Sequence, residues 1–289
     1  GGFFMTRRRF PVGKTLLYGF MSLWALTTIY PFIWVILNSF KPRGLIRSDT
    51  FSLPIGDKFT LENYVTAFKR VDIGTAYVNS IVISGAVTVV VMVLAGLAAY
   101  AMVRYSFRLR GFLHSMIIAS MMFPVFSTII PVFRMESSWG IVNTGSIWLT
   151  RLSVVLPQIA GNLSFAIIVL MGFIRSLPVD LEEAAYLEGY NVYQIFFRII
   201  MPLAKPSFAT VGIFTFLWSY NDLFLQMFFL RSKKFFTITR LLNEISSQAG
   251  TNYGLMVAAV VMVVIPVLVV YIFLQNYIIK GMTAGAVKG

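Results

Sequence analysis

Long apolar runs dominate this 289-residue sequence and restrict what it can fold into. A helix needs about 20 apolar residues to cross the roughly 30 Å hydrocarbon core of a membrane. Backbone polar groups in hydrocarbon must be bonded within the protein, and a helix meets that requirement. The sequence therefore predicts an all-α integral membrane protein with about six transmembrane helices. The predicted spans are Leu16–Leu37, Val78–Met102, Phe112–Phe133, Val154–Phe173, Ser207–Leu230 and Leu255–Ile278.

Composition and charge agree with a membrane protein and exclude several other classes. Hydrophobic residues make up 58% of the chain and charged residues 12%, about half the charged share of soluble domains. The formal net charge is +13, but the basic residues are scattered over loops, as expected beside membrane spans and not for nucleic-acid binding. Cysteine is absent, which excludes disulfides and thiolate metal sites. The single histidine, His114, has no partner motif for a metal or for general-base chemistry.

The basic residues near the first spans predict the orientation. Arg7, Arg8 and Arg9 precede the first apolar run, as in a signal peptide, but the run is too long and lacks a small-residue cleavage site. We therefore expect a retained helix and cytoplasmic N- and C-termini in a bacterial inner membrane. Residues 1–289 are expected to form one transmembrane domain. Its predicted parts outside the spans are a cytoplasmic N-terminus (1–15), an external loop (41–74), a cytoplasmic loop (175–206) and a cytoplasmic tail (280–289).

The 175–206 loop concentrates acidic residues, a glycine and two prolines in an otherwise apolar chain. Asp180 and Glu183 have the spacing of a capping box, which predicts a helix start. Gly189 interrupts the helical pattern, and Pro202 is expected to end it. The loop is therefore predicted to form two short helices, Asp180–Glu188 and Asn191–Met201, that meet at a bend on the inner membrane surface.

This loop resembles the E-A-A-x3-G-x9-I-x-L-P motif of permease subunits of binding-protein-dependent ATP-binding-cassette importers. The stretch "EAAYLEGYNVYQIFFRIIMP" departs from it only at Met201, which replaces leucine with a residue of similar volume. The resemblance implies a coupling helix that docks in a cleft of an ATP-binding subunit. The residues that match the motif are Glu183, Ala184, Ala185, Gly189, Ile199 and Pro202.

Further matches indicate the carbohydrate-uptake permeases, specifically the second, maltose-type subunit of a heterodimeric pair. "AAYAMVRYSF" at Ala98–Phe107 and "YND" at Tyr220–Asp222 are similar to family patterns, with Tyr220 in place of the usual tryptophan. The ending "KGMTAGAVKG" at Lys280–Gly289 resembles the family's terminal signature. Such tails reach the interface between the ATPase subunits. The tail residues assigned to that interface are Gly285, Ala286, Lys288 and Gly289.

The resemblance implies a set of partners and no catalysis by this chain. The expected partners are a second homologous permease, two ATP-binding subunits, an external solute-binding protein and the lipid bilayer. ATP and Mg²⁺ are expected in the partner ATPase subunits, and no cofactor or metal in this chain. Gly13-Lys14-Thr15 ends like a Walker A loop, but Arg8 occupies the position of its first glycine.

Tyr220, Asn221, Asp222 and Gln226 form the one polar cluster that falls within a predicted span. Charged groups in a membrane tend to face a cavity or a partner, so the cluster is a candidate lining of a translocation path. Asparagine and glutamine also join helices, which leaves a role in helix pairing open.

Two other function classes remain alternatives. An ion-coupled secondary transporter would use Asp222 as its coupling carboxylate, and a membrane scaffold would show no substrate dependence. Within the importer interpretation, the substrate is expected to be a sugar or oligosaccharide. Outer basic residues leave an anionic saccharide as one option, and these residues are Arg134, Arg151, Arg231, Lys233 and Lys234.

Overall fold

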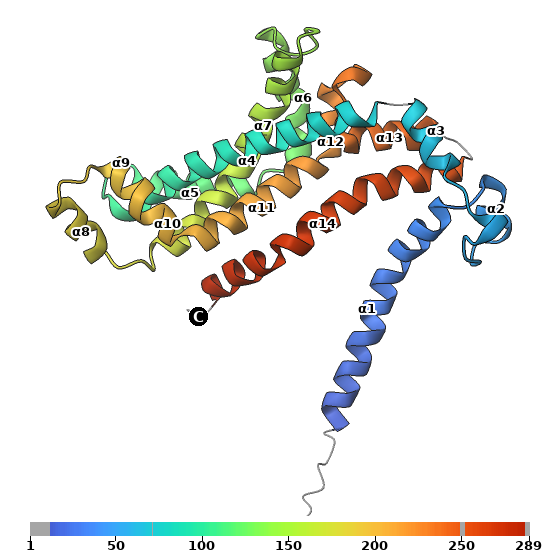
Figure 1. Cartoon of the computed structure of the whole chain (residues 1–289). Helices are drawn as coiled ribbons and strands as arrows, with labels where there is room; N and C mark the ends of the chain where they lie inside the picture. Colours follow the sequence, from blue (N-terminus) through green and yellow to red (C-terminus); the bar gives the residue numbers. More distant parts are fainter. Residues whose placement is uncertain (1–11, 71, 249–251, 287–289) are drawn as a thin grey trace, which may run out of the picture. The chain divides into compact units, whose positions relative to one another are not determined.

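The computed structural model describes residues 12–70, 72–248 and 252–286 (Figure 1). Every regular element in these ranges is a helix, which confirms the all-α prediction. The chain forms two compact units, which are described separately. The first comprises Gly1–Arg70 and Ile245–Met262, and the second comprises Val71–Glu244 and Val263–Gly289.

The described helices include four that are long and apolar enough to cross a membrane. The number rises to as many as six if Arg110–Met121 with Val125–Ser138 counts as one broken span and Val192–Leu203 with Lys205–Asn221, which meet at 83°, counts as another. This range agrees with the predicted number of spans. The four single helices are α1 (Val12–Ser39), α4 (Ile73–Arg104), α7 (Ile147–Ile174) and α14 (Tyr253–Ala286).

The predicted third span, Phe112–Phe133, is not a continuous helix. It consists of α5 (Arg110–Met121) and α6 (Val125–Ser138), which meet at an angle of 104°. Pro124 stands at the break and has an extended backbone. Proline lacks an N–H donor and disfavours helical geometry in the residue before it, which accounts for a break at this position.

The predicted fifth span, Ser207–Leu230, is also interrupted. Helix α11 (Lys205–Asn221) ends at Asp222, whose backbone is extended, and α12 (Leu223–Phe229) follows. The side chain of Asp222 accepts a hydrogen bond from the Leu225 amide at 3.2 Å. Asp222 therefore starts a new helix instead of lying within a span, as N-cap aspartates commonly do. A 3₁₀ turn (Lys233–Phe235) and α13 (Ile238–Gln248) complete this stretch.

The core of the second unit is built on α4, which packs most extensively against α7 and α11. Small residues on α4 allow the close approach: Ala95 and Ala99 are fully buried. At Gly96 an added Cβ would lie 2.8 Å from Phe208 Cζ and 2.9 Å from Phe196 Cζ. Close packing of this kind is typical of membrane helix pairs.

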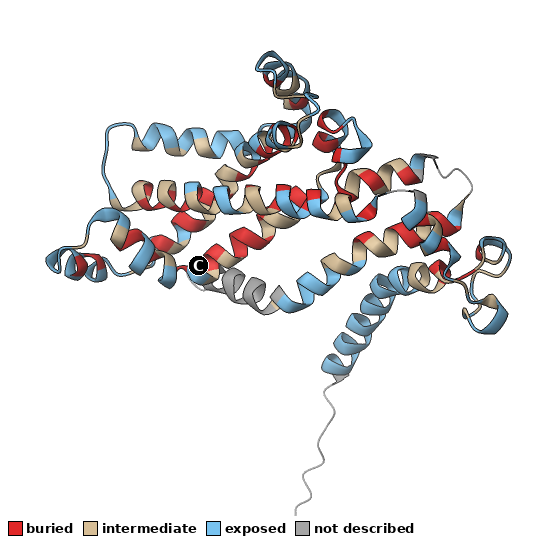
Figure 2. Ribbon diagram, turned by 45° about the horizontal axis from the view of Figure 1, so that its top comes forward, coloured by how far each residue is buried: buried red, intermediate tan, exposed pale blue. Residues whose placement is uncertain are grey.

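The first unit combines an exposed apolar helix with a polar cap. Most side chains of α1 are exposed (Figure 2), including Leu16, Phe20 and Trp24, as suits a helix in lipid. The cap that follows it contains the short helices α2 (Arg43–Ser48) and α3 (Glu62–Arg70) and a 3₁₀ turn (Gly56–Lys58).

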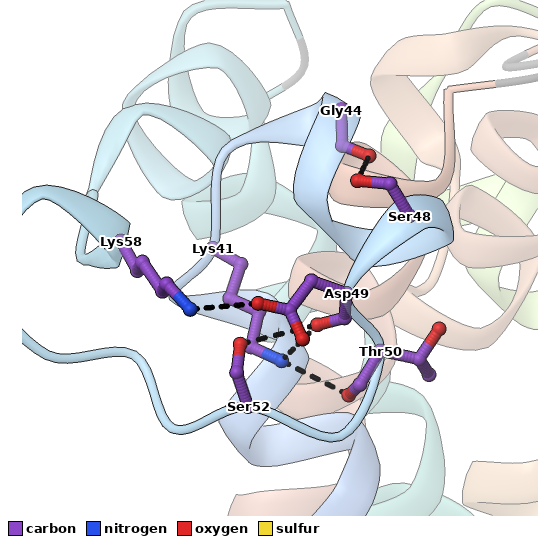
Figure 3. A network of polar contacts seen from close by, with 7 residues as sticks. All are labelled: Lys41, Gly44, Ser48, Asp49, Thr50, Ser52 and Lys58. Carbon is purple, nitrogen blue, oxygen red and sulfur yellow. Dashed lines mark hydrogen bonds and ion pairs between the residues drawn. The ribbon is translucent and has the colours of Figure 1, made fainter.

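A buried lysine organises this cap (Figure 3). Lys41 Nζ donates hydrogen bonds to the carbonyl oxygens of Asp49 and Thr50, at 3.0 and 2.9 Å. Its removal from water lowers the pKa of Lys41. The neighbouring ion pair between Lys58 and Asp49 is 2.7 Å long and more exposed, and the hydrogen bond from Lys58 lowers the pKa of Asp49.

We expect Gly96→Ala to lower the thermal unfolding midpoint of the purified protein. Its Cβ forces the rings of Phe196 and Phe208 to move, and overpacking costs about 1–3 kcal/mol. Gly85→Ala on the same helix is the control, because a Cβ there meets nothing within 4 Å. Equal midpoints for the two variants would contradict this packing.

Lys41→Met is expected to loosen the cap, because two backbone carbonyls lose their donor at a cost of about 1–3 kcal/mol. Lys58→Met removes only the exposed ion pair, and such pairs contribute little. Hydrogen exchange of the amides in residues 43–60 measures the difference. The prediction fails if both variants exchange at the wild-type rate.

Candidate functional site

The first helix of the 175–206 segment is α8 (Asp180–Leu187), and it begins where the sequence predicts. The predicted capping box is wrong, because the N-cap is Val179 and no side chain caps the helix. The amides of Glu182 and Glu183 donate to the carbonyl of Val179 instead. Asp180, Glu182 and Glu183 all lie in the first turn, where negative charge is favourable beside the positive end of the helix dipole.

The bend after α8 depends on Gly189, as predicted. Its φ is +87°, a left-handed conformation that glycine adopts without steric cost. The amides of Gly189 and Tyr190 donate to the carbonyls of Tyr186 and Ala185, at 3.0 Å each. These two bonds form a Schellman motif, which satisfies the last carbonyls of the helix.

The second helix of the pair starts with a capping box that sequence reasoning missed. Asn191 and Gln194 exchange side-chain to backbone hydrogen bonds of 2.9 Å, the arrangement expected of this motif. The helix consists of α9 (Val192–Ile195), a π-helical segment (Phe196–Ile200) and α10 (Met201–Leu203). It thus continues through Pro202, and α11 begins after Ala204.

We call α8 with the helix from Val192 to Leu203 the bent helix pair. One side of it is buried through Ala185, Ile195 and Phe196, and Ile199 is half-buried. The other side is exposed and holds Glu183, Ala184, Gly189 and Pro202. Leu187 is 91% exposed and Tyr193 is 68% exposed. The exposed surface of the bent helix pair therefore combines large apolar side chains with charged ones, namely Asp180, Glu183, Glu188 and Arg198.

A buried polar cluster holds the bent helix pair to α4. Glu182 accepts a hydrogen bond of 2.8 Å from the Tyr100 hydroxyl and forms an ion pair of 2.6 Å with Arg104. Arg104 Nη2 also donates to the carbonyl of Leu177 at 3.0 Å. We call the side chains of Glu182, Tyr100 and Arg104 the α4 clamp. Sequence reasoning noted the stretch that contains Tyr100 and Arg104 but did not pair it with Glu182, because residues about 80 positions apart show no local pattern.

Two exposed aromatic contacts accompany the clamp. The hydroxyl groups of Tyr105 and Tyr186 form a hydrogen bond of 2.9 Å, which raises the pKa of Tyr186. Within the bent helix pair, the Arg198 guanidinium lies 5.8 Å from the centre of the Tyr190 ring, within the range of a cation–π contact.

The predicted polar cluster at Tyr220–Gln226 lies at the junction of α11 and α12 and is largely bonded within the protein. Gln158 on α7 donates to Asp222 Oδ2 at 3.1 Å and accepts a hydrogen bond from the Ser219 hydroxyl. Gln226 is buried, donates to the Ser219 carbonyl at 3.2 Å and accepts from the Thr237 hydroxyl. These bonds join helices. Helix pairing is one of the two roles that the sequence left open for this cluster, beside lining of a translocation path.

The other two members of the polar cluster, Asn221 and Tyr220, differ in exposure and in hydrogen bonding. Asn221 is exposed and donates to the carbonyl of Leu217 at 2.9 Å. Tyr220 is 4% exposed, and its hydroxyl has no hydrogen-bond partner among the described residues.

The C-terminal tail is only partly described. Gly285 and Ala286 lie at the end of α14, and only their helical backbone is described. Lys288 and Gly289 lie outside the described residues. Among the described residues, no group of three or more His, Cys, Asp or Glu side chains is placed to hold a metal ion.

The fold and the bent helix pair together define a class: a polytopic helical membrane protein with a structured, surface-exposed helix pair between two spans. Residues 91–284 match the family described as "Binding-protein-dependent transport system inner membrane component". This match covers more than half of the chain, so the chain belongs to that family.

Curated relatives align over nearly the whole chain. The diacetylchitobiose uptake system permease protein NgcG of Streptomyces coelicolor is 33% identical over 273 residues, which cover 94% of this chain and 88% of that protein. The melibiose/raffinose/stachyose import permease protein MelC of Bacillus subtilis is 31% identical over 90% of this chain and 91% of its own length. The trehalose transport system permease protein SugB of Mycobacterium tuberculosis is 32% identical over 90% and 93%.

Solved structures show the same fold. A chain of a bacterial ABC transporter involved in the import of the acidic polysaccharide alginate superposes with a TM-score of 0.78 at 24% identity, over 96% of this chain and 99% of that chain. A chain of the alginate transporter in complex with a periplasmic protein that holds an alginate pentasaccharide superposes with a TM-score of 0.66 at 18% identity.

The α4 clamp predicts that only one of two adjacent glutamates is needed to hold α8. Glu182→Ala removes the carboxylate that pairs with the largely buried guanidinium of Arg104. Breaking a buried ion pair costs about 3–5 kcal/mol, so this variant should speed hydrogen exchange of the α8 amides. Glu183→Ala removes an exposed side chain from the same turn and should leave exchange unchanged. Comparable exchange in the two variants would rule out the clamp.

Proposed function

We propose that the chain is one of two dissimilar membrane subunits of an ATP-driven importer that moves a sugar or oligosaccharide across the inner membrane. Membership of the binding-protein-dependent family supports delivery by an external solute-binding protein. The saccharide class is supported by relatives whose names give diacetylchitobiose, melibiose, raffinose, stachyose and trehalose as cargo.

The observation that carries the docking part of this proposal is the exposed face of the bent helix pair. Glu183 is exposed although Glu182 beside it is buried, so the two carboxylates serve different neighbours. Leu187, Tyr193 and Phe197 are exposed on the same helix pair. Aromatic and other apolar side chains bordered by polar groups are typical of a protein interface. The bent helix pair would enter a cleft of an ATP-binding subunit, where Glu183 would pair with a basic group.

The remaining partners follow from the same proposal. Two ATP-binding subunits would bind ATP and Mg²⁺ and perform the hydrolysis, and this chain would perform no catalysis. The N- and C-termini would lie in the cytoplasm with the bent helix pair. Gly285, Ala286, Lys288 and Gly289 would reach the interface between the two ATP-binding subunits. For Tyr220, Asn221, Asp222 and Gln226, a place in the translocation path and a role in helix pairing both stay predictions.

An ion-coupled transporter that works alone is less well supported. Its coupling carboxylate would have to exchange ions or protons, but both oxygens of Asp222 accept hydrogen bonds, from Gln158 and from the Leu225 amide. These bonds stabilise the start of α12 and its contact with α7. Asp222 therefore has a structural role in the helix junction.

We expect Glu183→Arg to reduce uptake and co-purification of the ATP-binding subunits at least tenfold, because the charge at the interface is reversed. The assay uses the complete complex with its binding protein and a radiolabelled oligosaccharide. Glu62→Arg, on an exposed site of α3, makes the same charge change elsewhere and should have no effect. Unchanged uptake and assembly in Glu183→Arg would remove the docking assignment.

A second variant tests the bend itself. Gly189→Ala forces a Cβ into a left-handed backbone at +87°, which costs more than about 1 kcal/mol. Gly140→Ala imposes a similar strain at a φ of +71° in a loop before α7. We expect only the first variant to impair assembly, and equal defects in both would show that the strain acts on folding alone.

A further inference from the structure

A cavity of about 580 Å³ lies between α6, α7 and the end of α11. Its volume is within the range of roughly 300–1,000 Å³ that is common for small-molecule sites. On α7 its lining runs from Leu156 to Phe165, in the middle of the helix, and no described lining residue belongs to the 175–206 segment. The cavity is therefore separate from the bent helix pair.

One acidic side chain in this cavity has a buried oxygen atom that no described residue hydrogen-bonds. Glu136, in the last turn of α6, lines the cavity and is 1% exposed. Its Oε2 atom makes no hydrogen bond with the described residues. Buried polar groups are nearly always hydrogen-bonded, and an unpaired buried carboxylate is costly. A ligand with hydroxyl groups would supply the missing donors.

The rest of the lining fits the faces of a sugar ring. Trp139 and Trp218 are large, flat side chains on the cavity wall and are 57% and 48% exposed. The Trp218 ring is fixed against Phe165, with ring centres 4.9 Å apart. Ser120 and Ser164 add a pair of hydroxyl groups that hydrogen-bond to each other. Aromatic walls with a few polar groups are the usual composition of a small-molecule site.

The charges favour a neutral saccharide over an acidic one. No lysine or arginine belongs to the described lining of the cavity, so the lining offers no cation to pair with an anionic saccharide. Two of the five outer basic residues that left an anionic substrate open contact other parts of the protein. Arg151 donates to Asn79 at 2.8 Å, and Arg231 lies 5.3 Å from the centre of the Phe133 ring.

We propose that this cavity holds a ring of a neutral saccharide in transit, with Glu136 accepting hydrogen bonds from its hydroxyl groups and Trp139 and Trp218 contacting its apolar faces. This inference rests on the proposed function, because it assigns a substrate subsite to the importer. A lipid chain would fill the same volume but would leave the carboxylate without a donor.

The test uses the complete importer complex and its tryptophan fluorescence, titrated without the binding protein. The probes are neutral trisaccharides of glucose, galactose and N-acetylglucosamine, and an alginate-derived uronate trisaccharide. For the neutral probe that the wild-type complex takes up, Glu136→Gln should weaken binding about tenfold, as expected for loss of a charged hydrogen-bond acceptor. Glu136→Gln should also lower the ratio of the affinity for that neutral probe to the affinity for the uronate trisaccharide.

Trp218→Phe should abolish most of the fluorescence response, whereas Trp148→Phe, outside the cavity lining, should keep it. Three results would overturn the subsite: wild-type affinity for the uronate that equals or exceeds that for the neutral probe, unchanged affinity in Glu136→Gln, or loss of the second permease from Glu136→Gln complexes. The last would show that the cavity is a subunit interface. If the wild-type complex takes up none of the probes, that result counts against the proposed function and not specifically against the subsite.

Discussion

The ion pair between Glu182 and Arg104 is the interaction on which the arrangement of the second unit depends. It joins a polar segment to the end of α4, where both charged side chains are largely shielded from water and each needs the other. Tyr100 and the carbonyl of Leu177 satisfy further hydrogen-bonding groups of the pair. Figure 1 shows the bent helix pair at one end of the second unit, with α12 toward the other end. Because α8 is fixed to α4 by this pair, a force on α8 acts directly on the core helix.

The requirement that backbone groups be bonded inside a membrane explains where the spans break. Pro124 and Asp222 both interrupt apolar runs, but the new helix that follows each one begins at once. At Asp222 the side chain itself caps α12, and Gln158 from α7 bonds to the same carboxylate. The polar residues in these runs are therefore part of the helix junctions. This is the form in which irregular backbone is tolerated at membrane depth, where neighbouring helices satisfy the freed groups.

The sequence predicts the helical class, most spans and the bend at Gly189, because these features follow from local patterns of apolar residues and one left-handed glycine. The prediction of one continuous span at Phe112–Phe133 is wrong, because a hydropathy pattern does not show that the chain changes direction at Pro124. The sequence also misplaces the cap of α8: Asp180 has the right spacing, but Val179 occupies the N-cap position. The contact between Glu182 and Arg104 and the cavity at Glu136 join segments distant in sequence, and tertiary packing of this kind has no local signature.

Two continuous helices determine how the ends of the second unit can influence each other. Helix α4 has 32 residues and α7 has 28, which corresponds to lengths of about 48 and 42 Å at 1.5 Å per residue. Their mutual packing is the most extensive between any two of the described helices, so neither can bend without disturbing the core. The helices that line the Glu136 cavity opposite α7 are instead short or broken, namely α6 and α11 with α12. Displacement of the bent helix pair would therefore move α4 and α7 as one rigid body, and the cavity would change shape at its broken wall.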